Sequence, residues 1–235
     1  MSQSAVVEPV GGSAAATGEP ARARTVLVTL IVIAAVANLP LAMANVALPS
    51  IGEALNASQT QLNLIAVAYS LGLACSVLWF GALGDRYGRK QIAILGVTLA
   101  IPAALVCGFA PNAGVLIFGR LLGGFAAGMA YPTTLALIAA LWGPGPGRTR
   151  SIALWAALGG AVSACGPLLS GLLLTGLAWN SVFFVVLPVA LLALVMGFKY
   201  LPSHVNESTE SVDNLGASFR LFLSVRSSWP STLLR

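Results

Sequence analysis

The sequence predicts an all-α, polytopic membrane protein with six transmembrane helices. The first observation behind this prediction is composition: 57% of the 235 residues are hydrophobic and only 8% are charged, whereas a soluble domain carries about 25% charged residues. The second is that the apolar stretches are continuous rather than alternating, which favours helices over a transmembrane β-barrel. A soluble enzyme is therefore disfavoured, and the 12 Lys and Arg residues are too sparse for a nucleic-acid-binding surface.

The spacing of the charged residues predicts the individual helices. Residues 25–52, 54–84, 91–119 and 121–147 carry no Lys, Arg, Asp or Glu, and each stretch has room for one span of about 20 residues. The charge-free stretch 151–198 has 48 residues. As one helix it would be about 72 Å long, more than twice the hydrocarbon core of about 30 Å, so it must reverse once. We place the reversal at 175–180 and predict spans near 25–48, 60–83, 91–110, 113–141, 151–175 and 180–200.

Lys and Arg accumulate on one side of this predicted topology. The loops expected at 49–59, 110–113 and 176–180 contain neither residue type. Because basic loops remain in the cytoplasm, both termini are predicted to be cytoplasmic, in a multi-pass protein of the cell membrane. The basic residues that fall on the predicted cytoplasmic side are Arg22, Arg24, Arg86, Arg89, Lys90, Arg148, Arg150 and Lys199.

These assignments divide the chain into three regions. Residues 1–24 lack the basic start and compact apolar core of a secretory signal, and their composition predicts a disordered cytoplasmic tail. Residues 25–200 are expected to form the six-helix transmembrane bundle. Residues 201–235 are expected to form a cytoplasmic linker and an atypical tail, because this stretch has no apolar run long enough to span a membrane.

A glycine-rich, charged segment joins the second and third predicted spans. Its glycines allow the backbone to reverse and neighbouring helices to approach closely. The carboxylate of Asp85 is expected at a helix N-terminus, where the helix dipole stabilises an anion. The basic side chains can pair with Asp85 or with anionic lipid headgroups, or they act only as a topology anchor. The candidate conformational residues are Gly81, Gly84, Asp85, Arg86, Gly88, Arg89 and Lys90.

Arg120 is the one ionisable residue that lies well inside a predicted span. A charge there costs at least about 2.5–3.5 kcal/mol on insertion scales and usually faces an aqueous cavity or a partner. The alternative is an Arg that extends to the nearer interface. Gly124 and Gly128 follow on the same helix face. Polar side chains that could line a substrate path, or form interhelical hydrogen bonds, are Asn38, Asn45, Gln61, Asn63, Tyr69 and Ser70.

The fifth predicted span carries small residues at four-residue intervals. This stripe allows close contact with another helix, and Pro167 is expected to kink the helix. Packing alone explains the pattern as well as a functional role does. The residues are Gly159, Ser163, Pro167 and Gly171, with Gly166 beside the proline.

Four segments carry a family resemblance. They are Asn-Val-Ala-Leu-Pro-Ser-Ile at 45–51, the charged segment at 81–90, Arg120-Leu-Leu-Gly-Gly with Gly128 and Pro132, and Gly-Pro-Leu-Leu-Ser-Gly at 166–171. Together, and in this order, they resemble the major facilitator superfamily of secondary transporters, in particular its fourteen-helix drug:proton antiporter branch.

The resemblance implies that the six helices form one half-bundle of such a transporter. It implies that Arg120 faces the central cavity and takes part in proton coupling, and that the small-residue face of the fifth helix packs against the opposite half. The implied function is multidrug efflux of small amphipathic or cationic molecules by alternating access, without covalent chemistry, cofactor or metal. The Ala- and Gly-rich composition indicates that the membrane is a bacterial plasma membrane. The implied partners are the lipid bilayer, the substrate, and a second half-transporter or a second copy of the chain; no nucleic acid is expected.

The sequence departs from the family pattern in three places. Pro40 stands where the branch usually has an Asp, so a carboxylate for proton antiport is missing from these spans. Trp-Asn-Ser-Val-Phe at 179–183 replaces a more basic and aromatic start of the sixth helix. The chain also stops where a seventh span would begin. We therefore expect a truncated or half-length transporter that is inactive alone; the alternative is a non-transporting six-span interaction protein or the remnant of a disrupted gene.

Overall fold

The computed structural model describes residue 20 and residues 22–202. Within this part the side chains of a few residues around the turn between the second and third helices are not described; these are Leu78, Gly81, Ala82, Asp85, Arg86 and Tyr87. The helices in the described part are α1 (Ala23–Leu55), α2 (Gln59–Tyr87), α3 (Arg89–Gly108), α4 (Ala113–Leu141), α5 (Pro146–Leu174), α6 (Ser181–Phe184) and α7 (Val186–Tyr200). The predictions for the two terminal tails lie outside the described residues, apart from the few residues that begin α1 and end α7.

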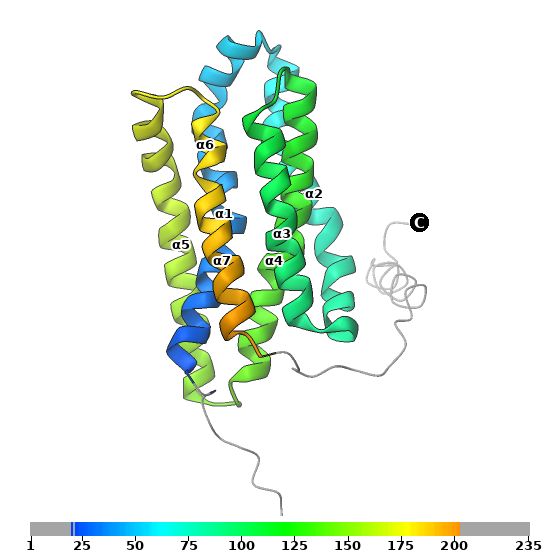
Figure 1. Ribbon diagram of the computed structural model, residues 1–235, viewed down its shortest axis with the longest axis vertical. Helices are drawn as coiled ribbons and strands as arrows, with labels where there is room; N and C mark the ends of the chain where they lie inside the picture. The colour runs from blue at the N-terminus through cyan, green and yellow to red at the C-terminus, as the bar shows by residue number, and fades with distance from the viewer. Residues whose placement is uncertain (1–19, 21, 203–235) are drawn as a thin grey trace, which may run out of the picture.

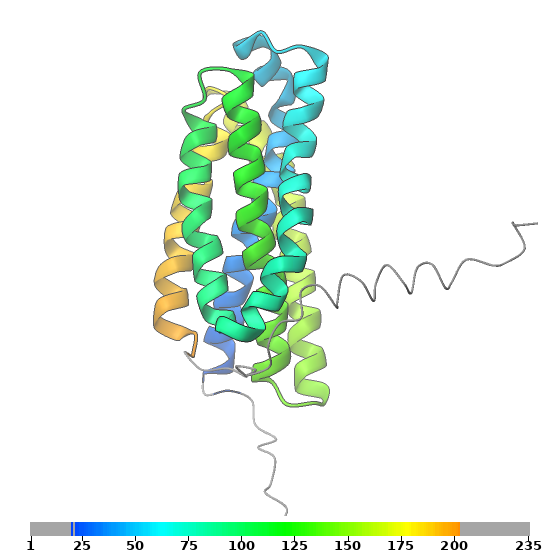
Figure 2. The same cartoon turned by 90° about the vertical axis from the view of Figure 1, so that its right-hand side faces the viewer.

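The long helices run along one common axis and form an elongated bundle (Figures 1 and 2). Six helical segments are long and apolar enough to cross a membrane, which confirms the predicted number of spans in the described part of the chain. The start of α1 and the end of α7 lie at the same end of the bundle, together with the α2–α3 and α4–α5 connections (Figure 1). The predicted basic loops therefore share one end; that this end faces the cytoplasm stays a prediction.

The α2–α3 connection is shorter than the sequence predicts. The helix α2 continues to Tyr87 and α3 begins at Arg89, so Gly88 is the single residue between them. The backbone of Gly88 has φ 99° and ψ 123°, a conformation that a glycine adopts without steric strain. The expected position of Asp85 at a helix N-terminus is wrong, because its backbone belongs to the last turn of α2. The N-cap of α3 is Gly88.

The sixth span differs from the prediction because it is interrupted. Its two helical segments, α6 and α7, meet at Val185. Pro188 has no backbone N–H, so the carbonyl of Phe184 four residues earlier loses its usual helical donor. The two segments still follow each other as one span from Ser181 to Tyr200.

Close packing places α4 and α1 at the centre of the bundle. The helix α4 packs most extensively against α2 and α3, whereas α1 packs against α5, α4 and α7. The contact of α4 with α2 depends on glycine: a Cβ at Gly124 would overlap the carbonyl oxygen of Tyr69, and one at Gly72 would overlap that of Leu121. Glycine at these positions lets the two helix backbones approach closely, as is typical of helix pairs in membranes.

Candidate functional site

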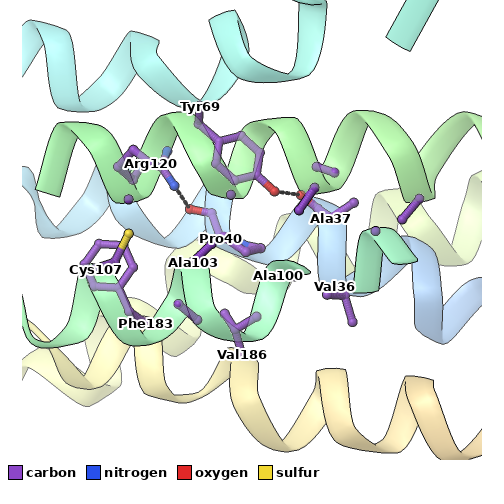
Figure 3. Close-up of a pocket in the computed structure, with 17 residues that line it drawn as sticks. Val36, Ala37, Pro40, Tyr69, Ala100, Ala103, Cys107, Arg120, Phe183 and Val186 are labelled. Atoms are coloured by element: carbon purple, nitrogen blue, oxygen red, sulfur yellow. Dashed lines mark hydrogen bonds between the residues drawn. The ribbon is translucent and has the colours of Figure 1, made fainter. Parts of the chain in front are cut away.

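The guanidinium of Arg120 lies inside the bundle, between α1, α2 and α4. The side chain is 1% exposed, so it does not extend to the membrane interface as the alternative interpretation would require. Its Nη1 donates to the carbonyl oxygen of Pro40 at 2.9 Å, and its Nε donates to that of Ile65 at 3.3 Å. Figure 3 shows the bond to Pro40. One side chain of α4 therefore binds the backbones of two other helices.

Tyr69 of α2 supports the same arrangement. Its ring centroid lies 4.5 Å from the Cζ of Arg120, a geometry in which the π-electrons of the ring attract the cation. Its hydroxyl donates to the carbonyl oxygen of Ala37 at 2.6 Å (Figure 3). Tyr69 is 2% exposed, and the predicted interhelical hydrogen bond from this residue is confirmed.

Both of these hydrogen bonds reach α1 close to Pro40. This proline lies inside the helix and lacks the N–H that would bond the carbonyl of Val36. The carbonyls of Ala37 and Pro40, on the same part of α1, accept bonds from Tyr69 and Arg120. At the position where the resemblance predicts a carboxylate, a backbone carbonyl thus binds the cation.

The second terminal nitrogen of the guanidinium, Nη2, is buried and has no hydrogen-bond partner among the described residues. Arg120 also lines a small, mainly apolar cavity of about 30 Å³. A site needs roughly 10–15 Å³ of such space to hold one water molecule, whereas a drug-sized ligand needs about 300–1,000 Å³. The cavity is therefore too small for a substrate. The residues that line the cavity include Ala37, Pro40, Tyr69, Cys107, Gly123 and Phe183. Figure 3 shows this cavity.

The other predicted cavity residues do not line this space. Gly124 and Gly128 face α2, where a Cβ at Gly128 would overlap the Ser76 hydroxyl. Asn38 donates to the carbonyl of Ala34 in its own helix at 3.1 Å, and Asn45 is exposed on the bundle surface. Of the five predicted cavity residues, Arg120 alone lines the described cavity, and a transport role for each of the five stays a prediction.

The small residues of α5 separate into two groups. A Cβ at Gly166 would come within 2.7 Å of the Ala42 side chain, so this glycine lies at the α1–α5 contact. A Cβ at Gly159 or Gly171 would meet no atom of the described chain within 4 Å. Ser163 is half-buried and Pro167 is exposed. The predicted stripe is therefore not one continuous packing surface within this bundle.

Two hydrogen bonds that sequence reasoning missed attach α5 to the bundle. The Ser170 hydroxyl donates to the carbonyl of Met43 at 2.9 Å, and the Trp155 indole donates to the Thr134 hydroxyl at 3.1 Å. All three side chains are buried. Nothing in the local sequence distinguishes these residues from other Ser, Thr and Trp residues in the spans, because their pairing depends on how the helices are rotated.

The basic residues of the charged segment bind helix carbonyls. Arg89 donates through Nη1 to the carbonyl of Ala136 in α4 at 2.7 Å. Lys90 donates to the carbonyl of Leu201 at 2.5 Å and to that of Phe198 at 3.4 Å. Phe198 lies in the last turn of α7, and a cation there is stabilised by the helix dipole. Gly84 and Gly88 are both buried, whereas the side chains of Asp85 and Arg86 are not among those that the structure describes.

Comparison with known proteins decides the family. The sequence model of the Major Facilitator Superfamily matches residues 30–234. The chain belongs to the major facilitator superfamily. The match extends to residue 234 and so includes most of residues 201–235, the predicted linker and atypical tail.

Several relatives within this superfamily are resistance or efflux proteins. The methylenomycin A resistance protein of Bacillus subtilis is 34% identical over 192 residues, covering 82% of this chain and 41% of that protein. The methyl viologen resistance protein SmvA of Salmonella typhimurium is 36% identical over 181 residues, covering 77% of this chain and 36% of the relative. The multidrug efflux pump LfrA of Mycolicibacterium smegmatis is 36% identical over 197 residues, covering 82% of this chain and 38% of the pump. The chain thus spans less than half the length of these relatives.

Solved structures support the same fold. A crystal structure of the peptide transporter POT in complex with sulfate aligns with a TM-score of 0.69 and 14% sequence identity. The alignment covers 86% of this chain and 44% of the POT chain. The described helices therefore adopt the fold of a major facilitator half-bundle, and the chain is a multi-pass protein of the cell membrane.

Proposed function

We propose that this half-bundle forms one wall of a secondary transporter that exports small molecules by alternating access, without covalent chemistry. The observation that carries the proposal is Arg120, a buried cation at membrane depth whose guanidinium has no carboxylate partner among the described residues. A charge in this place is expensive, and in membrane proteins it usually belongs to a substrate or ion pathway. Superfamily membership and relatives named for drug resistance support the same function.

The second wall is proposed to be another six-helix bundle. Transporters of this fold bind substrate between two halves, which rock against each other. The outer face of α5 is available for such a contact, since Leu168 and Leu172 are 74% and 71% exposed. The second bundle is either a separate half-transporter or a second copy of this chain.

The charge distribution limits the proposed substrate. In the described helices the acidic residues are Glu53 and Asp85, and both lie near helix ends. A cationic or amphipathic drug would therefore need carboxylates from the second bundle, because Arg120 repels cations. We propose such drugs as substrates on the names of the relatives, and assign Arg120 to coupling or conformational control rather than direct binding of a cation.

The test is gradient-driven dye transport in proteoliposomes. The purified chain is reconstituted alone, and together with the C-terminal half of the Bacillus subtilis relative, and accumulation of a cationic dye is followed under an imposed proton gradient. We expect saturable accumulation with both halves, reduced at least about tenfold by Arg120→Ala, whereas Thr175→Ala should transport normally. Accumulation that is unaffected by Arg120→Ala would contradict the role of the cation.

The oligomeric state distinguishes the two proposed partners. If the chain alone transports and elutes as a dimer, a second copy supplies the other wall. If the chain alone transports as a monomer, the proposal of a half-transporter is wrong. Light scattering of the same purified sample in detergent provides this measurement.

A further inference from the structure

A groove on the outer surface of the bundle lies between α3 and α7, beside the start of α3. It has a volume of about 370 Å³ and is lined by Lys90, Gln91, Ile94, Leu95, Thr98 and Phe198. Leu95 and Phe198 are 52% and 63% exposed. The groove is therefore open to the surroundings of the bundle and is separate from the cavity at Arg120.

The groove changes from polar to mainly apolar along α3. Lys90 and Gln91 are in the first turn of the helix, at the end where the basic loops gather. Thr98 is eight residues after Lys90, so the groove extends about 12 Å along the helix at 1.5 Å per residue. The polar part thus lies at the level of the lipid headgroups, and the side chains of Ile94 and Leu95 lie at the level of the acyl chains.

Lys90 gives the polar part of the groove a positive charge. Its ammonium group has three N–H donors, and two of them bond the carbonyls of Leu201 and Phe198. The C-terminal end of α7 carries a partial charge of about −0.5 elementary charge from the helix dipole, which neutralises only part of the charge of Lys90. No carboxylate pairs with Lys90 among the described side chains, and Lys199, at the same end, adds a second positive charge. One donor and part of the charge remain for an anion.

We propose that this groove binds an anionic glycerophospholipid. The phosphate accepts a hydrogen bond from Lys90 and another from the Gln91 amide, and an acyl chain lies along Ile94, Leu95 and Phe198. Lipid is the occupant because the apolar part faces outward from two membrane-spanning helices, where acyl chains are the solvent. An anionic headgroup is favoured because basic pockets at a membrane surface attract anionic lipids. By joining Lys90 of α3 to the end of α7, the lipid would stabilise the contact between these two helices.

The test is native mass spectrometry of the purified, delipidated full chain in detergent. Phosphatidylglycerol and phosphatidylcholine with identical acyl chains are titrated separately. We expect one phosphatidylglycerol to bind at least about tenfold more tightly than phosphatidylcholine. Millimolar inorganic phosphate should not displace it, because phosphate lacks the acyl chain that fills the groove.

Two variants separate the headgroup contact from the groove itself. Lys90→Gln should bring the affinity for phosphatidylglycerol to that for phosphatidylcholine. Leu95→Trp keeps the charge and fills the exposed groove, so it should weaken both lipids; because this side chain lies on the surface, the bundle should still fold. Lys199→Gln, which removes a charge at the same end but outside the groove lining, should retain the preference.

Three results would overturn the proposal. The first is equal binding of the two lipids to the unsubstituted chain. The second is unchanged binding of phosphatidylglycerol in both Lys90→Gln and Leu95→Trp. The third is a dimer that dissociates in Leu95→Trp, which would identify a second copy of the chain as the occupant.

Discussion

The guanidinium of Arg120 connects α4 to α1 and α2 through hydrogen bonds. It binds backbone carbonyls of α1 and α2, and it lies against the Tyr69 ring. Hydrogen bonds to a charged group contribute about 1.5–3 kcal/mol each. The planar geometry of arginine allows two separate carbonyls to be bound at once, which a lysine ammonium on a flexible chain does less well.

We therefore expect Arg120→Lys to destabilise the bundle although the charge is kept. The loss of one charged hydrogen bond and of the ring contact corresponds to about 2 kcal/mol. For a chain of this size that lowers the Tm by roughly 4–8 °C. Thermal unfolding in detergent, followed by circular dichroism, measures the change. Thr175→Ala, which removes an exposed hydroxyl bound within its own turn, is the control; equal Tm values for the two variants would contradict the role of the guanidinium.

Gly84 and Gly88 of the charged segment differ in backbone conformation. Gly88 has a positive φ of 99°, whereas Gly84 is helical and a Cβ there would meet its nearest atoms, in Arg89 and Ile92, at 3.9 Å. We expect Gly88→Ala to cost about 1–3 kcal/mol because the backbone must hold a strained conformation. Gly84→Ala should be neutral or slightly stabilising, since alanine favours helix. Denaturation of both variants under identical conditions tests this, and the reverse order of stability would refute the explanation.

At the scale of helices, glycine determines which pairs approach closely. The α2–α4 contact has Gly72, Gly124 and Gly128 facing the opposite backbone or side chains, with no room for a methyl group. The outer part of α5 has equally small residues without such a neighbour. Identical residue types therefore have different energetic roles in the two helices.

Alanine substitution should reveal this difference directly. Gly124→Ala would force the Tyr69 carbonyl and the α2 backbone away from α4, and we expect a cost of about 2–3 kcal/mol from overpacking. Gly171→Ala places its methyl group where no described atom lies within 4 Å, so it should be neutral or gain up to about 1 kcal/mol from helix propensity. The Tm of each purified variant is the measurement. A Gly124→Ala protein as stable as Gly171→Ala would show that α2 and α4 are not in close contact.

For the whole molecule, an even number of spans places the start of α1 and the end of α7 on the same side of the membrane. The basic connections gather at this end (Figure 1), and the positive-inside rule assigns it to the cytoplasm. In a variant whose cysteines are replaced, Asn112→Cys should react with a membrane-impermeant maleimide in intact cells. Thr149→Cys, in the first turn of α5 at the opposite end of the bundle, should react only after permeabilisation. Both positions are exposed, so a reversed pattern would contradict the orientation rather than report burial.

The sequence alone determined the class, the number of spans and their approximate places. The reason is that a bilayer separates apolar from charged residues, so Arg89, Lys90 and Arg150 mark helix ends without any knowledge of contacts. It also predicted that Arg120 lies inside a span. It misplaced Asp85 and the end of α2, because a helix continues through charged residues when it leaves the membrane.

The tertiary structure decided what these residues contact. The direction of a side chain depends on the rotation of its helix, which is set by packing against residues far away in the sequence. Only the folded bundle shows that Arg120 binds the carbonyl of Pro40, that Gly124 lies against Tyr69, and that a Cβ at Gly171 would meet no described atom within 4 Å. Hydropathy distinguishes membrane from water, but inside the bundle every helix is apolar, so close packing and backbone hydrogen bonds specify the site.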